Sequence, residues 1–471
     1  MSQHGAASNE YTAGIAQFVS GLRFEDIPGE VIERIKLLIL DSLGCAIFGS
    51  QLPWSRILME TLGAVDTTPG CAVWGTNRRL SAPHAALVNG TLVQSFELDD
   101  VHRVGVLHVG AVTLPALLAV AELRGNMTGR DFLTAAVAGY EIGPRVGMCM
   151  GQEHIGQGWH SGATVGVFSA CAAASRALEL DPERTVHALG ITGTQSAGLM
   201  AAQFGAMVKR MHAGRSSQSG LYGALLAERG FTGIIDLFEN EYGGFCTTFS
   251  ASLDKFDRRE LTAGLGSQWE TMRIALKFYS CVGSNHTTLD ALRTIQARRP
   301  FGVEELERIV VHGSRVTVDH VGWPYEPQGL TSAQLNLPYC VAVLLLDGDV
   351  FVDQFTEAQV ADPRRIEVSR LVRVVEDPAI TARGKTFRHM VKVEVILRDG
   401  TRMEEVVESP KGSEHSFADA DTVLAKFRKL ASRRIGVAAA DQLAEAVLHA
   451  EELPDAGRIV ELLTVAGGGQ A

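Results

Sequence analysis

The chain has 471 residues, of which 46% are hydrophobic and 21% are charged, and this excludes a disordered or fibrous protein. A chain of this length should form two or three domains. Its formal net charge is -11, without the basic excess that would indicate nucleic acid or an anionic membrane as a partner.

The seven cysteines lie far apart in the sequence. This favours buried free thiols in a reducing compartment over a disulfide framework, a zinc ribbon or an iron–sulfur cluster. The polar N-terminus lacks the apolar core of a signal peptide. The most apolar stretch, residues 162–180, carries Arg176 and is predicted to be a buried helix, not a membrane span. We therefore expect a cytoplasmic protein without a membrane partner.

Up to residue 272 the sequence predicts helices in series. Apolar residues recur at helical spacing over residues 27–49, 111–124, 131–147, 162–180, 181–190 and 217–229. Thr128 is a suitable N-cap for the third of these helices, and Gly230 ends the last. Alternating β patterns are scarce here, and many helix faces consist of Ala, Gly and Ser, which allows close helix packing.

The pattern changes near residue 273. Strands are predicted over residues 309–318, 366–375 and 390–407, and Asp399-Gly400 in the last is a hairpin turn signal. Helices are predicted over 339–346, 419–431 and 438–451. The expected fold is mainly α: a large all-helical domain (1–272 and 410–471) and a smaller α+β lid domain (273–409) inserted before the C-terminal helices. Three consecutive domains are the alternative.

Residues 95–108 concentrate polar groups just before an apolar helix. Two adjacent carboxylates, Asp99 and Asp100, stand close to His102 and His108. Either carboxylate could act as a base or orient a histidine, and His108 could do acid–base work. The alternatives are a capping aspartate with surface histidines, or a metal site, for which no recognised ligand spacing is present.

His160 directly precedes a helix of small residues. Free backbone N–H groups at a helix start suit a carboxylate ligand, so His160 is a candidate for the site. The alternative is a histidine whose hydrogen bonds are satisfied by the local backbone.

Residues 209–215 bring together three cations and a histidine: Lys209, Arg210, His212 and Arg215. The stretch leads into the helix predicted from Ser217, and positive charge at a helix start is what a di- or tricarboxylate requires. The Gly-rich pattern of a phosphate-binding P-loop is missing. A solvated basic turn is the alternative.

At the predicted domain junction stand Lys277, Tyr279, Cys281 and His286. Clefts between domains are favoured ligand sites. Lys277 could bind a carboxylate, and the others offer donors, acids or a Cys–His nucleophile pair. The alternative is a linker whose His286 caps a helix over residues 288–297. Jointly, the four segments favour proton removal next to a carboxylate, with cations stabilising the developing charge.

These motifs resemble those of the MmgE/PrpD family, which includes 2-methylcitrate dehydratase, cis-aconitate decarboxylase and iminodisuccinate epimerase. The resemblance covers nearly the whole chain. It is carried by Phe96-Glu-Leu-Asp-Asp, His108, Leu114-Pro-Ala-Leu-Leu, Gly139-Tyr-Glu-Ile-Gly, Gly158-Trp-His, Lys209-Arg-Met-His-Ala-Gly-Arg, Gly230-Phe-Thr-Gly and Lys277-Phe-Tyr-Ser-Cys.

The resemblance implies a homodimer with no metal or organic cofactor and a pocket between body and lid. The catalytic residues it implies are Asp99 or Asp100, His108, His160, Lys209, His212 and Lys277. The substrate, a small anionic polycarboxylate, would also contact Arg210, Arg215, Tyr279, His286 and Tyr325, the last a looser match to a lid tyrosine.

Two departures from the family pattern bear on the reaction. Val101 replaces a common threonine, and Cys281 and Val282 stand where the family's decarboxylases place a further histidine. The sequence therefore favours a 2-methylcitrate dehydratase-like lyase. An epimerase of a dicarboxylate such as iminodisuccinate comes second, a cis-aconitate-type decarboxylase third and a non-catalytic polycarboxylate binder fourth. A metal-dependent hydrolase built on Asp99, Asp100, His102 and His108 is a further alternative.

Overall fold

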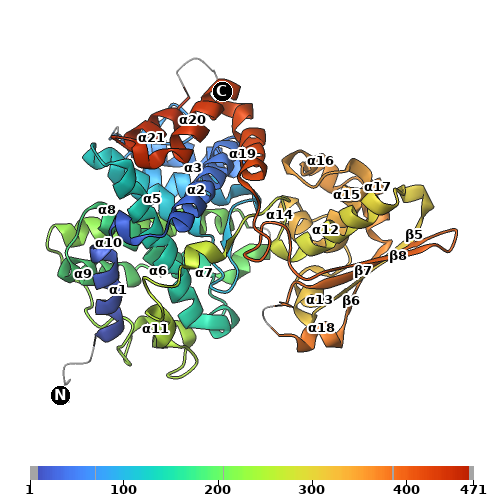
Figure 1. The fold of residues 1–471 in the computed structure, drawn as a ribbon, viewed down its shortest axis with the longest axis horizontal. Coiled ribbons are helices and arrows are strands. Elements are labelled where there is room, and N and C mark those ends of the chain that lie inside the picture. The colour runs from blue at the N-terminus through green and yellow to red at the C-terminus, as the bar shows by residue number, and fades with distance from the viewer. Residues whose placement is uncertain (1–8, 69, 205, 385–386, 466–471) are drawn as a thin grey trace.

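The computed structural model describes residues 9–68, 70–204, 206–384 and 387–465. Helices α1–α11 and α19–α21 form a large body, and a smaller lid, α12–α18 with strands β5–β8, stands beside it (Figure 1). The predicted mainly α fold, with a small α+β part before the C-terminal helices, is confirmed. Among the described residues, no helix is long and apolar enough to cross a membrane.

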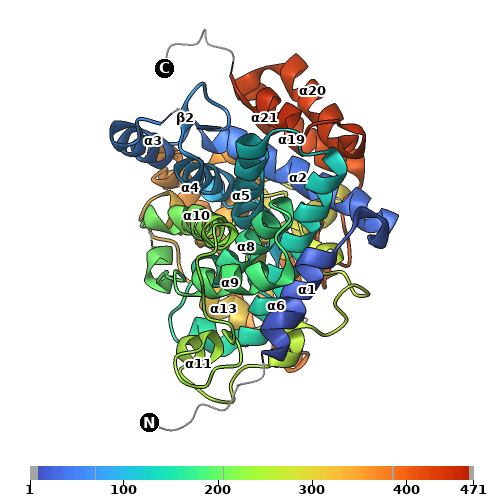
Figure 2. The ribbon, with the colours of Figure 1, turned by 90° about the vertical axis from the view of Figure 1, so that its left-hand side faces the viewer.

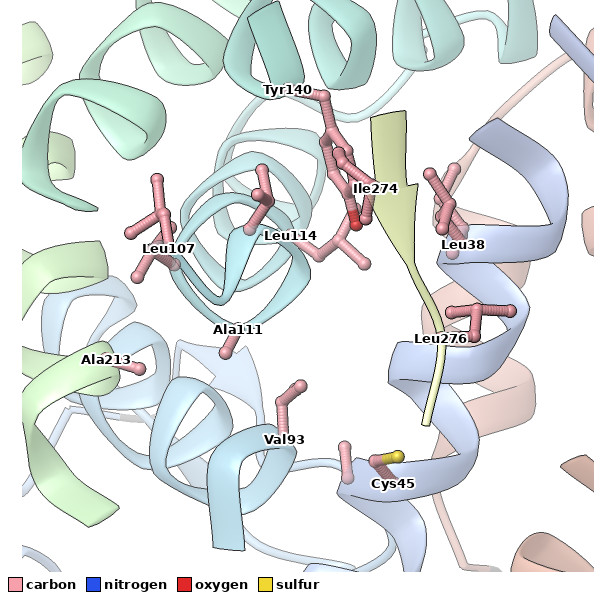
Figure 3. Packing of buried hydrophobic residues seen from close by; sticks show 14 of the residues in the cluster. Leu38, Cys45, Val93, Leu107, Ala111, Leu114, Tyr140, Ala213, Ile274 and Leu276 are labelled. Carbon is pink, nitrogen blue, oxygen red and sulfur yellow. The ribbon is translucent and has the colours of Figure 1, made fainter. Parts of the chain in front are cut away.

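The body is arranged around α5 (Val109–Arg124), which is buried on every side from its first residue to Ala121. Figure 2 shows α5, α8 and α10 near the middle of the body. Figure 3 shows Ala111 and Leu114 of α5 in one apolar core with Leu38 of α2 and Tyr140 of α6. The other body helices before the lid are α1 (Glu10–Gly21), α2 (Gly29–Gly49), α3 (Pro53–Val65), α4 (Ala82–Val93), α6 (Gly129–Gly156), α7 (Ser161–Thr164), α8 (Gly166–Ala177), α9 (Pro182–Gly193), α10 (Val208–Glu228) and α11 (Phe245–Ser250).

Two glycines set α10 directly against α4. A Cβ atom on Gly214 would lie 1.9 Å from the carbonyl oxygen of Leu87, and one on Gly90 would lie 2.6 Å from the Cα atom of Gly214. Any side chain at either position would therefore push the two helices apart. This close approach brings the first turn of α10 beside the segment that follows α4, where the candidate site begins.

The lid contains a four-stranded sheet in the order β6-β5-β7-β8. Strand β5 pairs in parallel with β6 and antiparallel with β7, which continues into the hairpin with β8. Residues 391–397 of β7 are mostly buried, whereas β8 alternates between exposed and half-buried positions. The strands are β5 (Leu306–Gly313), β6 (Val372–Glu376), β7 (Val391–Leu397) and β8 (Arg402–Val407). The lid helices are α12 (Gly283–Arg298), α13 (Arg315–Val321), α14 (Leu330–Leu335), α15 (Leu337–Asp347), α16 (Glu357–Val360), α17 (Pro363–Ser369) and α18 (Pro378–Ala382).

After the lid, the chain returns to the body through α19 (Ala420–Ile435), α20 (Val437–Leu448) and α21 (Gly457–Leu463). Helix α19 packs on α2, where the buried Lys426 ammonium lies 2.6 Å from the Asp41 carboxylate. Short β pairs also connect segments of the body. The pair β1 (Cys71–Ala72) and β2 (Arg79–Leu80) is local, whereas β3 (Val101–His102) pairs with β4 (Ile274–Ala275). The second pair fixes residues 99–108 beside the segment that leads to Lys277.

Several predicted boundaries were wrong. The strand expected over 309–318 begins at Leu306 and ends at Gly313, and α13 follows it. The strand expected over 366–375 is half helix, because α17 precedes β6. Helix α10 begins at Val208, nine residues before the expected start, so the cationic stretch lies inside the helix. Likewise α12 includes His286 instead of being capped by it. The β7–β8 hairpin around Asp399-Gly400 is confirmed.

Candidate active site

The site begins where α4 ends in the short helix η2 (Gln94–Phe96). The next residue, Glu97, has a φ of 55°, in the left-handed region that residues other than glycine seldom adopt. Such strained backbone is held in place by surrounding contacts and is enriched at functional sites. The turn buries the Glu97 side chain, which is 4% exposed, and directs it toward α10.

Three buried cations surround the Glu97 carboxylate. Lys209 in the first turn of α10 donates to it, Arg210 donates at 2.7 Å, and the ammonium of Lys277 lies 3.4 Å away. Burial alone would raise the pKa of Glu97, but Lys209, Lys277 and Arg210 hold it well below its usual range. Glu97 is therefore ionised. Because one carboxylate faces three cations, the cluster keeps an excess of positive charge, which suits an anionic ligand.

The two lysines differ in their pKa shifts. Burial lowers the pKa of Lys209, although Glu97 opposes this. Burial also works against a charge on Lys277, but Glu97 and Asp99 together raise its pKa. The Lys277 ammonium lies 3.8 Å from the Asp99 carboxylate. Lys277 is thus a fixed cation, and Lys209 is the more acidic of the two ammonium groups.

Asp99 and His108 form the second part of the site. An oxygen of Asp99 lies 3.0 Å from Nδ1 of His108, the N-cap residue of α5. Asp99 is fully buried, which would raise its pKa, but His108 and Lys277 lower it. Asp99 is thus an anion within ion-pair distance of Nδ1 of His108.

Asp100 has a different environment from its neighbour. Both of its oxygens accept from the backbone N–H of Gly110 in the first turn of α5, at 3.0 and 3.1 Å. Burial, with the charge of Asp99, raises its pKa to about 8. Asp100 is therefore protonated at neutral pH and binds the start of α5, the capping alternative that the sequence left open.

His160 and His212 form a buried pair with their Nδ1 atoms 3.0 Å apart. Burial lowers the pKa of both rings, and Lys209 lowers each further. Both are therefore neutral at pH 7, and one donates to the other. A Cβ atom on Gly162 would lie 3.1 Å from the His160 ring, and one on Gly198 would lie 3.5 Å from the His212 ring. Gly162 therefore leaves room for His160, whereas a side chain at Gly198 would collide with Ala163, at 2.2 Å, and not with His212.

The lid contributes Gln334, a residue that the sequence analysis missed. Its side-chain oxygen accepts from Arg210 at 3.2 Å, and its nitrogen donates to the carbonyls of Phe96 at 3.1 Å and Ser280 at 3.0 Å. Gln334 is fully buried and belongs to α14. Its hydrogen bonds therefore connect the lid to the body next to the Glu97 carboxylate and the cations that surround it.

His320 of α13 was also not singled out by the sequence analysis. Its Nδ1 lies 3.3 Å from the hydroxyl of Ser284. The side chain is exposed, yet enough protein surrounds it that burial lowers its pKa, with Arg388 and Lys209 adding to the effect. His320 is therefore near enough to Arg388 and Lys209 for their positive charges to act on its ring.

Four predicted substrate contacts have other hydrogen-bond partners in this structure. Arg215 is exposed, and its guanidinium donates to the side chain of Gln218, which lies three residues further along the same face of α10. Three others are buried and already paired: the Tyr279 hydroxyl donates to Asp290 at 2.7 Å, His286 contacts the carbonyl of Cys281 at 3.1 Å, and the Tyr325 hydroxyl donates to the carbonyl of Val360 at 2.8 Å.

The residues of the metal-site alternative do not converge. Nε2 of His102 lies 2.9 Å from the Glu270 carboxylate, and its Nδ1 accepts from the backbone N–H of Gly105. Neither ring nitrogen is therefore free to bind a metal ion together with Asp99 and His108. Within the described ranges, no group of three or more His, Cys, Asp or Glu residues could hold a metal ion. The hydrolase alternative thus lacks a ligand set in this part of the chain.

The candidate site does not coincide with the larger cavities described on the body. Two surface cavities of about 350 and 340 Å³ lie on the body away from it, one beside Arg79 and Glu122 and the other beside Arg124 and Asp131. Neither cavity is lined by a residue of the histidine and lysine cluster.

Comparisons with known proteins agree with the resemblance noted in the sequence. The MmgE/PrpD N-terminal domain matches residues 13–256, and the MmgE/PrpD C-terminal domain matches residues 279–452. The chain is 36% identical to the cis-aconitate decarboxylase-like protein oryM of Aspergillus oryzae, over 96% of this chain and 97% of the relative. It is 32% identical to cis-aconitate decarboxylase of Aspergillus terreus, over 98% of both chains, and 26% identical to that of Homo sapiens, over 96% and 94%. The chain therefore belongs to the MmgE/PrpD family of enzymes.

Proposed function

We propose that this protein is a lyase that decarboxylates a small unsaturated tricarboxylate of the cis-aconitate type. The observation that carries the proposal is the group of three buried cations, Lys209, Arg210 and Lys277, around one carboxylate beside a neutral histidine pair. The sequence ranked dehydration first. Similarity along the full chain to relatives named as cis-aconitate decarboxylases moves decarboxylation ahead of dehydration.

The chemistry needs positive charge and one proton. In cis-aconitate, the carboxylate on the saturated carbon is allylic to the double bond. When its bond to that carbon breaks, CO₂ leaves and the electron pair forms a new terminal double bond. The former π pair then takes a proton at the far alkene carbon, giving a methylene dicarboxylate. Negative charge develops toward the carboxylate attached to that carbon, so fixed cations lower the barrier.

The residues of the site can share these tasks. Lys277, held cationic by Glu97 and Asp99, would bind a carboxylate that the substrate retains. The proton would come from His108, which lies beside Asp99, or from Lys209, whose pKa burial lowers. A positioned donor of this kind contributes roughly 100- to 10,000-fold in rate.

Dehydration or epimerisation would begin differently, with removal of a proton next to a carboxylate. The neutral His160–His212 pair favours this second candidate, because a neutral imidazole is a competent base. The further histidine of the family's decarboxylases is replaced in this chain by Cys281 and Val282. Cys281 is fully buried, and Val282 is the N-cap residue of α12.

One NMR experiment separates the candidate reactions. The protein is incubated in heavy water with cis-aconitate, 2-methylcitrate or iminodisuccinate, one at a time. We expect cis-aconitate to lose CO₂ and the product to carry one new deuterium on carbon. Loss of water from 2-methylcitrate, or deuterium uptake by iminodisuccinate without CO₂ release, would instead establish dehydration or epimerisation. Binding without any exchange or conversion would leave a polycarboxylate-binding protein.

The proposal includes the assembly and division of the chain implied by the family resemblance. We propose a homodimer, with a helical domain of residues 1–272 and 410–471 and a lid domain of residues 273–409. Light scattering of the purified protein gives its mass directly, and a single species near the 50.6 kDa of one chain would contradict the dimer.

A further inference from the structure

Gln94 is a buried amide without a partner. The side chain is 0% exposed, and among the described residues neither its amide nitrogen nor its oxygen has a hydrogen-bond partner. Folded proteins seldom leave a buried amide unpaired, because its lost contacts with water are not replaced. A residue of this kind therefore calls for a bound molecule or another specific explanation.

The amide lies inside the candidate site. Gln94 is the first residue of η2, three positions before Glu97. A Cβ atom on Gly162 would lie 3.9 Å from the amide nitrogen of Gln94 and 3.1 Å from the ring of His160. Because Gly162 has no side chain, this residue leaves the space between the Gln94 amide and the His160 ring open.

Neighbouring residues show that this segment is otherwise well satisfied. The hydroxyl of Ser95, the next residue, donates to the carbonyl of Thr91 at 2.6 Å and accepts from the indole of Trp54 at 3.2 Å. Gln334, the fully buried glutamine on the lid side, makes three hydrogen bonds at 3.0 to 3.2 Å. Gln94 is therefore one of several unsatisfied side chains in this part of the described structure, together with Asp99 and Ser280, and it is the one that carries an amide donor.

We propose that the Gln94 side chain is a substrate-binding group whose amide N–H donates to a carboxylate of the bound polycarboxylate. The inference rests on the proposed function for the class of substrate. A neutral amide suits this place, since Lys209 and Arg210 already supply charge nearby and a further cation would be repelled. By holding one carboxylate beside His160, Gln94 fixes which carbon of the substrate faces the histidine pair.

The test compares the same substitution at two buried glutamines. Methionine matches glutamine in length but cannot donate or accept as an amide does. In Gln94→Met we expect an unchanged or higher melting temperature, because no hydrogen bond of the free protein is lost, and a KM at least about tenfold higher. In Gln334→Met, the matched control, we expect a lower melting temperature, because three hydrogen bonds are lost.

A binding measurement tests the role of Gln94 independently of which reaction the protein catalyses. Thermal shift with citrate or tricarballylate reports binding even if no turnover is found. If these anions stabilise the wild-type protein and stabilise Gln94→Met much less, Gln94 binds substrate whatever the reaction proves to be. Gln94→Glu, which adds a negative charge, should weaken the stabilisation further.

Three results would overturn the inference. One is a fall in melting temperature for Gln94→Met equal to that for Gln334→Met with an unchanged KM, which would show a structural role. Another is an unchanged melting temperature with unchanged affinity, which would show that water alone meets the amide. The third is the absence of stabilisation of the wild-type protein by any polycarboxylate, which would overturn the proposed function as well.

Discussion

Asp100 offers the sharpest test of the electrostatics of the site. Burial and the charge of Asp99 raise its pKa to about 8 from an ordinary value of 3.8. Between these two pH values the folded protein keeps the proton and the unfolded chain releases it. Because the folded state then binds more protons, the free energy of unfolding falls as pH rises, by about 1.4 kcal/mol per pH unit. From pH 5 to pH 7 the loss is about 2.7 kcal/mol.

The substitution Asp100→Asn removes this fall in the free energy of unfolding with rising pH. The asparagine amide resembles a protonated carboxyl in shape and cannot ionise. We expect the free energy of unfolding of Asp100→Asn, relative to wild type, to improve by about 2 to 3 kcal/mol between pH 5 and pH 7. Denaturant unfolding at both pH values measures this. Asp399→Asn, an exposed control whose carboxyl has a lowered pKa, should run parallel to wild type over this range. If Asp100→Asn also runs parallel, Asp100 is ionised in the folded protein and the assignment fails.

The other predictions concern turnover. Glu97→Gln leaves three buried cations without the carboxylate that they share. We therefore expect a lower melting temperature, measured by calorimetry, and at least about a 100-fold loss of kcat, measured by CO₂ release. An active and stable variant would show that the cations need no counter-charge. His160→Gln should cut kcat by about 100-fold or more without loss of fold, and a loss below about tenfold would demote it to a supporting residue. Arg215→Ala should keep wild-type kcat and KM, because the side chain faces solvent; a raised KM would return it to the site.

Much of the fold could be predicted from local pattern. The long helices show helical periodicity, and the Asp399-Gly400 turn between alternating stretches specifies the β7–β8 hairpin. The start of α10 could not be predicted, because its first turn carries Lys209 and Arg210, whereas acidic and capping residues are the usual signal there. Contact with Glu97, which is distant in sequence, outweighs the unfavourable interaction of these cations with the helix dipole.

The composition of the site could be predicted better than its geometry. Four distant segments were expected to meet, and the contacts join Lys209 to Lys277 through Glu97, and Lys277 to His108 through Asp99. Sequence reasoning passed over Glu97, because three acidic residues within four positions give no sign of which one faces the cations. That choice depends on the left-handed turn at Glu97, which no local pattern marks.

Asp99 and Asp100 show why neighbouring residues of one type need separate physical arguments. Both are fully buried, so burial raises the pKa of each. Asp99 faces His108 and Lys277, whose charges outweigh the cost of burial, and it is an anion beside a catalytic candidate. Asp100 faces the backbone N–H of Gly110 and no positively charged side chain among those that shift its pKa, so it keeps its proton and binds the start of α5. Because ionising one carboxylate makes ionising the other costlier, each role depends on the other. Asp99→Asn should therefore lower the pKa of Asp100 as well as loosen His108.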